Sequence, residues 1–137
     1  MAENDEAPKP NHNNVDERLA RHGHISYLEI PAFDIERSAA FYNSVFSWSI
    51  QRRDTGQCSF DDGSGDLIGR WVTGRVVSRE PGLLPYIYVD HIDAIVARVV
   101  SQGGEVVEPP YPEGNLWVAT FRDPAGNVMG VWQAGPR

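Results

Sequence analysis

The sequence predicts an α+β fold built from two βαβββ modules, residues 23–74 and 83–134. One observation is an internal repeat, in which "GSGDLIGRW" at 63–71 and "PAGNVMGVW" at 124–132 share glycine, aliphatic and tryptophan positions at an offset of 61. A second is that each half opens with a β-like run followed by a single amphipathic helical segment. A unit this short covers its apolar face only by packing against its twin, so the modules are expected to form one domain.

The first module reads as one strand, one helix and three strands. "HISYLEI" at 24–30 is β-branched and aromatic, and "DIERSAAFYNSVF" at 34–46 has apolar residues at helical spacing with Asp34 as N-cap. Turn signals containing glycine and aspartate separate the remaining runs. These three strands are expected around "WSIQRR", "QCSF" and "DLIGRWV".

The second module repeats this plan. The strand "LPYIYV" at 84–89 precedes the helical "HIDAIVARVVSQGG", where Gly103 and Gly104 mark the stop. Three more strands are expected in "EVVEP", "LWVATF" and "NVMGVWQ". The repeat offset is 57 early in the modules and 61 later, and the four extra residues are most simply placed in "PPYPEG".

Composition narrows the function classes. A chain of 137 residues with a net charge of −7 is one ordinary domain that repels phosphate backbones, which argues against nucleic-acid binding. The single cysteine, Cys58, excludes an internal disulfide, and no apolar run resembles a membrane span or a signal peptide. We therefore expect a cytoplasmic protein with no membrane association. Residues 1–22 are polar and are expected to be a disordered tail.

Strand alternation divides the side chains between two faces. Leu28, Ile30, Ile68, Ile87, Val89, Met129 and Val131 are assigned to the face that packs beneath the helices. The opposite face is predicted to hold an aromatic small-molecule site with two glycines among large rings. Leu67 and Val128 are assigned to this face without a role, and Glu29 is the candidate catalytic residue. The candidate ligand-binding residues on it are Tyr27, Gly69, Trp71, Leu84, Tyr86, Tyr88, Gly130 and Trp132.

Two interpretations of the glycines and the rings stay open. Glycine at 69 and 130 leaves space for a ligand, or it relieves crowding where a curved sheet bends. Aromatic walls suit a planar or apolar molecule, whereas the alternative is a dry aromatic core.

Glu29 is the one acid that alternation places on the aromatic face. Buried among rings, its pKa would rise and it would serve as a general base, or it would stay ionised against a cationic ligand. The alternative is a structural carboxylate tied to an arginine such as Arg70 or Arg122.

The helix "DIERSAAFYNSVFSW", the terminal "FRDPAGNVMGVW" and the duplication together resemble the vicinal-oxygen-chelate superfamily of glyoxalases, bleomycin-resistance proteins and extradiol dioxygenases. The resemblance covers residues 23–134. It implies a curved, cup-shaped mixed sheet with helices on its outer face, and a divalent metal held in the cup by residues on the first and last strands of each module.

The four metal positions of that family fall on Tyr27, Gly69, Leu84 and Gly130. The usual histidines are replaced by tyrosine and leucine, and the usual carboxylates by glycines, which leaves too few donors for an ion. We therefore predict no metal and no other cofactor.

Two histidines near the predicted strands do not restore the metal donors. His24 stands an odd step from Tyr27, so a regular strand places it at the rim or on the helix side unless a bulge intervenes. His91 precedes the second helix, where a capping or surface role is expected.

The sequence thus predicts a metal-free small-molecule-binding protein, expected to be a homodimer, with any catalysis left open. One alternative is a metal-dependent lyase, isomerase or dioxygenase with ligands such as His24 and Glu29. Another is a resistance protein that sequesters a cationic drug, similar to the bleomycin-resistance members.

Overall fold

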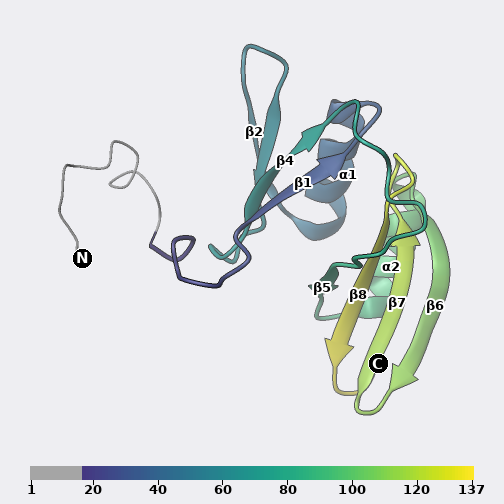
Figure 1. The fold of residues 1–137 in the computed structure, drawn as a ribbon. Helices are drawn as coiled ribbons and strands as arrows, with labels where there is room; N and C mark the ends of the chain where they lie inside the picture. The colour runs from purple at the N-terminus through teal and green to yellow at the C-terminus, as the bar shows by residue number, and fades with distance from the viewer. Residues whose placement is uncertain (1–16) are drawn as a thin grey trace.

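The computed structural model describes residues 17–137, so positions 1–16 of the expected tail lie outside the described residues (Figure 1). Within residues 17–137, two helices and eight strands follow one another in the predicted order, and both βαβββ modules are confirmed. The first module contains β1 (Tyr27–Pro31), α1 (Ile35–Phe46), β2 (Ser49–Arg52), β3 (Cys58–Asp61) and β4 (Ile68–Val72). The second contains β5 (Tyr86–Tyr88), α2 (Ile92–Ser101), β6 (Glu105–Glu113), β7 (Leu116–Arg122) and β8 (Val128–Ala134).

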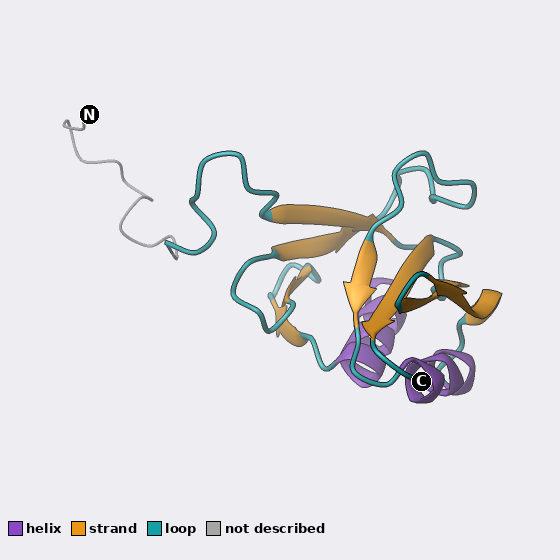
Figure 2. Ribbon diagram, turned by 90° about the horizontal axis from the view of Figure 1, so that it is seen from below, coloured by secondary structure: helices purple, strands orange, loops and turns teal. Residues whose placement is uncertain are grey.

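The strands form two separate four-stranded mixed sheets, ordered β1-β4-β3-β2 and β5-β8-β7-β6. In each sheet the first strand pairs in parallel with the last, and the other pairings are antiparallel. The single cup-shaped sheet that the resemblance implied is therefore not formed within one chain, where β1 and β5 each occupy the outer edge of a sheet. Both helices lie on the same side of the molecule (Figure 2).

Local signals explain where the helices begin and end. Asp34 caps α1 by accepting a hydrogen bond from the backbone N–H of Arg37 at 3.1 Å, as predicted. Ser47 ends α1 in the left-handed conformation at φ 64°. His91 occupies the N-cap position of α2 without a side-chain capping bond, so its position is as predicted but its imidazole does no capping.

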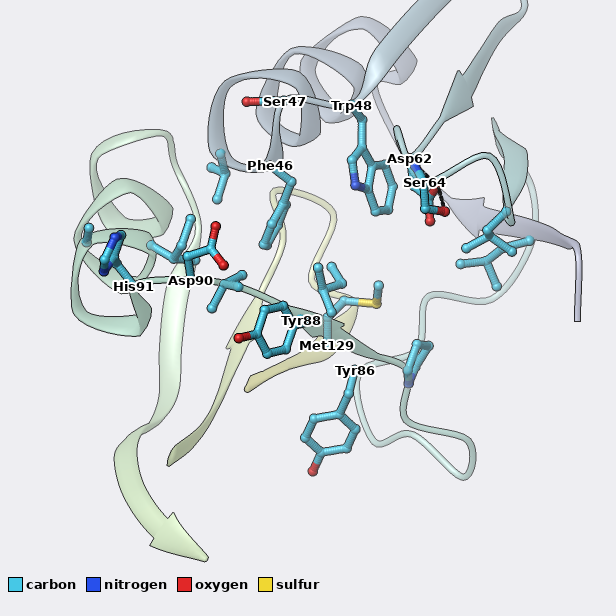
Figure 3. A pocket seen from close by; sticks show the side chains of 18 residues that line it. Phe46, Ser47, Trp48, Asp62, Ser64, Tyr86, Tyr88, Asp90, His91 and Met129 are labelled. Carbon is cyan, nitrogen blue, oxygen red and sulfur yellow. Dashed lines mark hydrogen bonds between the residues drawn. The ribbon is translucent and has the colours of Figure 1, made fainter. Parts of the chain in front are cut away.

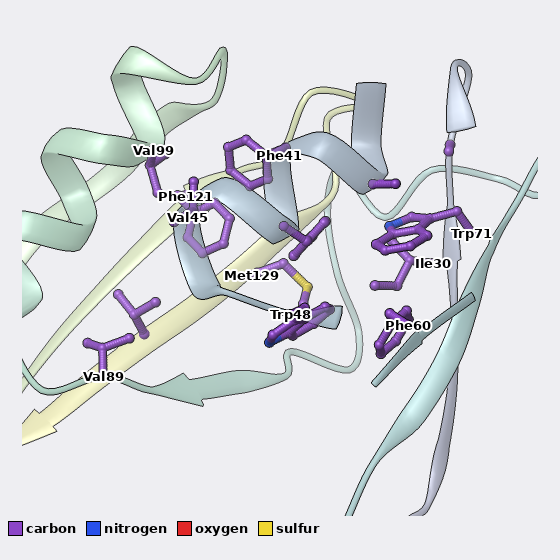
Figure 4. Packing of buried hydrophobic residues seen from close by; sticks show 14 of the residues in the cluster. Ile30, Phe41, Val45, Trp48, Phe60, Trp71, Val89, Val99, Phe121 and Met129 are labelled. Atoms are coloured by element: carbon purple, nitrogen blue, oxygen red, sulfur yellow. The ribbon is translucent and has the colours of Figure 1, made fainter. Parts of the chain in front are cut away.

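One hydrophobic core lies under both modules and joins them (Figure 4). In the first module the rings of Tyr42 and Trp48 stack with centroids 4.8 Å apart, and Trp48 stacks on Phe60 at 4.6 Å. Phe41 of α1 reaches Phe121 of β7 at 6.0 Å, which extends the aromatic packing into the second module. The modules are thus held together through α1 and its aromatic residues, which explains why their sheets need not share a strand edge.

A buried polar network also joins the modules. The Tyr42 hydroxyl of α1 donates to Asp123 Oδ2 at 2.8 Å, and Asn127 Nδ2 donates to the Pro31 carbonyl at 2.7 Å. Asp123 Oδ1 accepts the backbone N–H groups of Ala125 and two following residues, which shapes the β7–β8 turn. Burial raises the pKa of Asp123, and these hydrogen bonds oppose the rise without cancelling it.

The segment before β1 contacts the turn that precedes β4. Arg21 pairs with the Asp66 carboxylate at 2.8 Å, and His24 Nε2 lies 2.6 Å from the Asp66 carbonyl oxygen. Arg21, which belongs to the expected tail of residues 1–22, therefore makes a defined contact. No helix within residues 17–137 has the length and apolar character needed to cross a membrane.

The only cysteine lies buried on β3. Cys58 is 1% exposed, and its Sγ donates to Glu36 Oε2 at 3.3 Å. Burial is the main reason that the pKa of this thiol is raised, and the neighbouring Glu36 carboxylate adds to the effect.

Candidate functional site

The open face of each sheet is the face turned away from the helices, and in the second module it is aromatic. Tyr86 pairs with Gly130, and Tyr88 pairs with Trp132, where the two rings meet edge to face at 4.7 Å. Tyr86 and Tyr88 are 45% and 50% exposed. The predicted face is confirmed for these four residues, and their binding of a ligand stays a prediction.

The prediction for Gly69 and Trp71 was wrong about the face. Trp71 is 1% exposed and packs under α1, with its ring 5.0 Å from Phe60 and 5.8 Å from Tyr42. Gly69 pairs with Leu28 on the same helix side, and a Cβ there would meet the Phe60 ring and the Leu28 carbonyl. Glycine at 69 therefore allows close packing of the core and opens no ligand space.

Tyr27 and Glu29 do lie on the open face of the first sheet. Tyr27 is 51% exposed, while Glu29 receives Arg70 Nε at 3.0 Å and Arg75 at 2.6 Å. The hydrogen bond from Arg70 is the main reason that the pKa of Glu29 is lowered. The expected rise in pKa was wrong, and the predicted pairing with Arg70 is confirmed. Arg122 pairs with Glu105 instead, at 3.7 Å.

The residues at the family's metal positions do not fit a divalent ion. Tyr27, Gly69, Leu84 and Gly130 offer one phenol among them, and Leu84 lies in the loop before β5. Within residues 17–137, no three histidine, cysteine, aspartate or glutamate side chains lie close enough to share an ion.

A cleft of about 560 Å³ lies between the modules (Figure 3). Phe46 and Trp48 line one side, and Tyr88 and Met129 line the other. We call this the intermodule cleft; its full lining is Leu28, Val45, Phe46, Ser47, Trp48, Asp62, Ser64, Leu67, Pro85, Tyr86, Ile87, Tyr88, Val89, Asp90, His91, Ala94, Ile95 and Met129. Tyr86 and Tyr88 belong both to this cleft and to the open face, because β5 is a short edge strand.

Sequence reasoning missed most of the cleft. The sequence pattern places Phe46 on the apolar stripe of the first helix and Trp48 at the start of the next expected strand, and neither pattern distinguishes a core wall from a cavity wall. Their role depends on the tertiary arrangement that places the end of α1 and β5 around the same cleft. Leu67, which alternation assigned to the aromatic face, lines the cleft.

Comparisons with known proteins agree with the fold and the repeat. The sequence profile of the Glyoxalase/Bleomycin resistance protein/Dioxygenase superfamily matches residues 23–131. CFP32 of Mycobacterium tuberculosis is 28% identical over 123 residues, covering 83% of this chain and 47% of CFP32. The anthracycline biosynthesis protein DnrV of Streptomyces peucetius is 28% identical over 137 residues, covering 82% of this chain and 48% of DnrV.

Among solved structures, TnmS3, an antibiotic binding protein from Streptomyces sp. CB03234, superposes with a TM-score of 0.63 at 25% identity. The match covers 82% of this chain and 97% of TnmS3. The present chain spans about half the length of the curated relatives CFP32 and DnrV.

Proposed function

The chain belongs to the Glyoxalase/Bleomycin resistance protein/Dioxygenase superfamily, and from this premise we propose that it binds a small planar organic molecule at the intermodule cleft. The observation that carries the proposal is the continuity of the cleft with the aromatic open face, which share Tyr86 and Tyr88. Together they offer a concave apolar wall and an adjoining aromatic platform. Small-molecule sites are typically concave and lined by apolar and aromatic side chains.

The volume and chemistry of the cleft favour a ligand with fused aromatic rings. About 560 Å³ lies within the usual range for sites of drug-sized ligands, roughly 300–1,000 Å³. Phe46, Trp48 and Tyr88 supply rings that stack against a planar molecule. The similarity to TnmS3, an antibiotic binding protein, and to DnrV, a protein of anthracycline biosynthesis, supports the same ligand class.

A cationic ligand is the second candidate, and two acids at the cleft favour it. Asp62 and Asp90 both line the cleft, and the chain carries a net charge of −7. Sequestration of a cationic aromatic drug would use these charges without any chemical step. Glu29 is a poor candidate for a general base because two arginines hold it ionised. We propose that binding needs no metal, since the residues at the family positions lack the donors.

We propose further that the binding unit is a homodimer. The two open faces belong to separate sheets within one chain. The edge strands β1 and β5 leave one edge of each sheet available for pairing with a second copy. CFP32 and DnrV are about twice as long as this chain, which is the length that two copies would supply. Sedimentation equilibrium tests this part, and a monomer at micromolar concentration contradicts it.

The binding test is a titration with doxorubicin, a planar cationic anthracycline, and with its uncharged aglycone, followed by calorimetry. We expect both to bind, and Tyr88→Ala to weaken both at least tenfold. Phe33→Ala is the matched control, because Phe33 is 77% exposed and lies outside the cleft.

The titration also separates the candidates. A preference for doxorubicin over its aglycone that is lost in Asp90→Asn favours the sequestering role. Recovery of unchanged compound by mass spectrometry supports binding without chemistry, and unchanged affinity after EDTA treatment supports binding without a metal. Absence of binding by both compounds contradicts the proposed ligand class.

A further inference from the structure

Three residues on three neighbouring strands meet at one point of the second sheet's open face. Gly130 of β8 pairs with Tyr86 of β5 on one side and with Thr120 of β7 on the other. Directly paired residues in a sheet project to the same face, so all three lie on the side away from α2. Val118 and Trp132 form the next pair on that face, which places the three residues beside the Tyr88–Trp132 rings.

The Tyr86 ring packs against the backbone of Gly130. A Cβ at position 130 would collide with the Cδ2, Cε2 and Cζ atoms of that ring, so the ring lies directly on the glycine backbone. Tyr86 is nevertheless 45% exposed, which leaves its other face open to solvent and to the intermodule cleft. The space that glycine leaves is therefore filled by a side chain that can rotate away.

Thr120 is buried with an unused hydroxyl. The residue is 5% exposed, and its Oγ1 makes no hydrogen bond with any described residue. Buried polar atoms nearly always have a partner, so an unpartnered one calls for an explanation. Arg122 Nε, on the same strand, is also unpartnered, but the guanidinium of Arg122 already pairs with Glu105. Thr120 has no such second contact.

We infer that the Thr120 hydroxyl is a hydrogen-bonding subsite for a hydroxyl or carbonyl on the edge of a planar aromatic ligand, and that the ligand reaches it by displacing the Tyr86 ring from Gly130. The inference rests on the proposed function and specifies its ligand. The aromatic plane would take the place of the Tyr86 ring on Gly130, next to Trp132, and the polar edge would meet Thr120. No covalent step is involved.

The test compares 2-naphthol with naphthalene, which differ only by the edge hydroxyl. Calorimetric or fluorescence titrations give a dissociation constant for each compound with the parent protein, Thr120→Val and Thr120→Ser. Valine keeps the shape and removes the hydroxyl, while serine keeps the hydroxyl. We expect the preference for 2-naphthol to fall about fivefold to tenfold in Thr120→Val, the effect of one net hydrogen bond, and to persist in Thr120→Ser.

A second variant tests the displacement of Tyr86. In Tyr86→Ala the Thr120 hydroxyl is open to water before the ligand arrives, so the preference for 2-naphthol should shrink to within about twofold because the ligand only replaces water. Tyr86→Phe, which keeps the ring, should retain the parent's preference. An unchanged preference in Tyr86→Ala shows that Tyr86 does not cover the subsite.

The outcomes separate this inference from the proposed function. If both compounds bind the parent and Thr120→Val keeps the full preference for 2-naphthol, the subsite is wrong while the binding function stands. If neither compound binds the parent and doxorubicin also fails to bind, both the proposed function and the Thr120 subsite are contradicted. Thermal melts of each variant confirm that the titrated protein is folded, and Thr120→Ala replaces Thr120→Val if the latter is not.

Discussion

The two modules carry the same Gly-x-Trp repeat on opposite sides of their sheets. In the first, Gly69 and Trp71 lie on the helix face, where Trp71 is 1% exposed in the core. In the second, Gly130 and Trp132 lie on the open face, where Trp132 meets Tyr88. The alignment of the two modules by their repeated letters therefore differs by one residue from their alignment by strand pairing.

Strand register shows where the difference arises. Glu29 pairs with Arg70, whereas its counterpart at offset 57, Tyr86, pairs with Gly130. The offset between the last strands is thus 130 − 70 = 60 in the structure, although the repeated letters match at 61. A shift of one residue moves every side chain to the other face. Duplicated modules can therefore share a motif while using it for core packing in one copy and for an open surface in the other.

The largest expected effect separates the two tryptophans. Trp71→Ala should lower the free energy of unfolding by about 3–5 kcal/mol, because it empties a large buried site. Trp132→Ala should lower it by about 1 kcal/mol, mainly through the lost contact with Tyr88. Urea denaturation of both variants measures the difference. Equal losses would contradict the assignment of the two rings to opposite faces.

The two glycines should differ in the same direction by a smaller amount. An alanine at position 69 would meet the Leu28 carbonyl and the Phe60 ring, and overpacking of this kind costs about 1–3 kcal/mol. An alanine at position 130 would meet the half-exposed Tyr86 ring, which can move, so we expect a loss below about 1 kcal/mol. Thermal and chemical denaturation check both values. A larger loss at Gly130 than at Gly69 would show that Tyr86 is fixed in place.

Thr120→Val should stabilise the protein, since it removes a buried hydroxyl without a partner. We expect the free energy of unfolding to rise by about 1 kcal/mol. The matched control is Thr73→Val at an exposed position, where little change is expected. A loss of stability in Thr120→Val would mean that its hydroxyl is bonded in solution, for example to water.

The carboxylates of Glu29 and Asp123 should make the free energy of unfolding depend on pH in opposite directions. This is the smallest of the expected effects. The lowered pKa of Glu29 means that its contribution to stability is present above about 4.5, its ordinary value, and is lost as pH falls through the lowered value. The raised pKa of Asp123 gives a contribution present below its ordinary value of 3.8 and lost as pH rises through the raised value.

Unfolding free energies of the parent, Glu29→Gln and Asp123→Asn between pH 3 and 7 test these signs. The advantage of the parent over Glu29→Gln should grow with pH. Relative to Asp123→Asn, the parent should weaken as pH rises. The same sign for both variants would contradict the arrangement around one of the two carboxylates.

The periodicity of apolar residues and the turn signals sufficed to predict both modules, the Asp34 cap and the open-face position of Tyr86, Tyr88 and Trp132. These features depend on residues close together in the chain. The face of Trp71 was mispredicted because the faces of β4 were assigned by analogy with the repeated motif in β8. The pairing register between two strands cannot be deduced from the sequence of either strand alone. The second arginine on Glu29, Arg75, comes from the connector after β4, and the intermodule cleft depends on how the two modules are placed relative to each other.

The reaction rate of Cys58 with thiol reagents reports local opening of the first module. Thiol reagents attack the thiolate, and this thiol is both buried under α1 and held protonated by its surroundings. Cys58 is the chain's only cysteine, so labelling occurs only after β3 separates from Glu36 and from the core. The labelling rate, compared with global unfolding, measures whether the first module opens alone or only together with its twin.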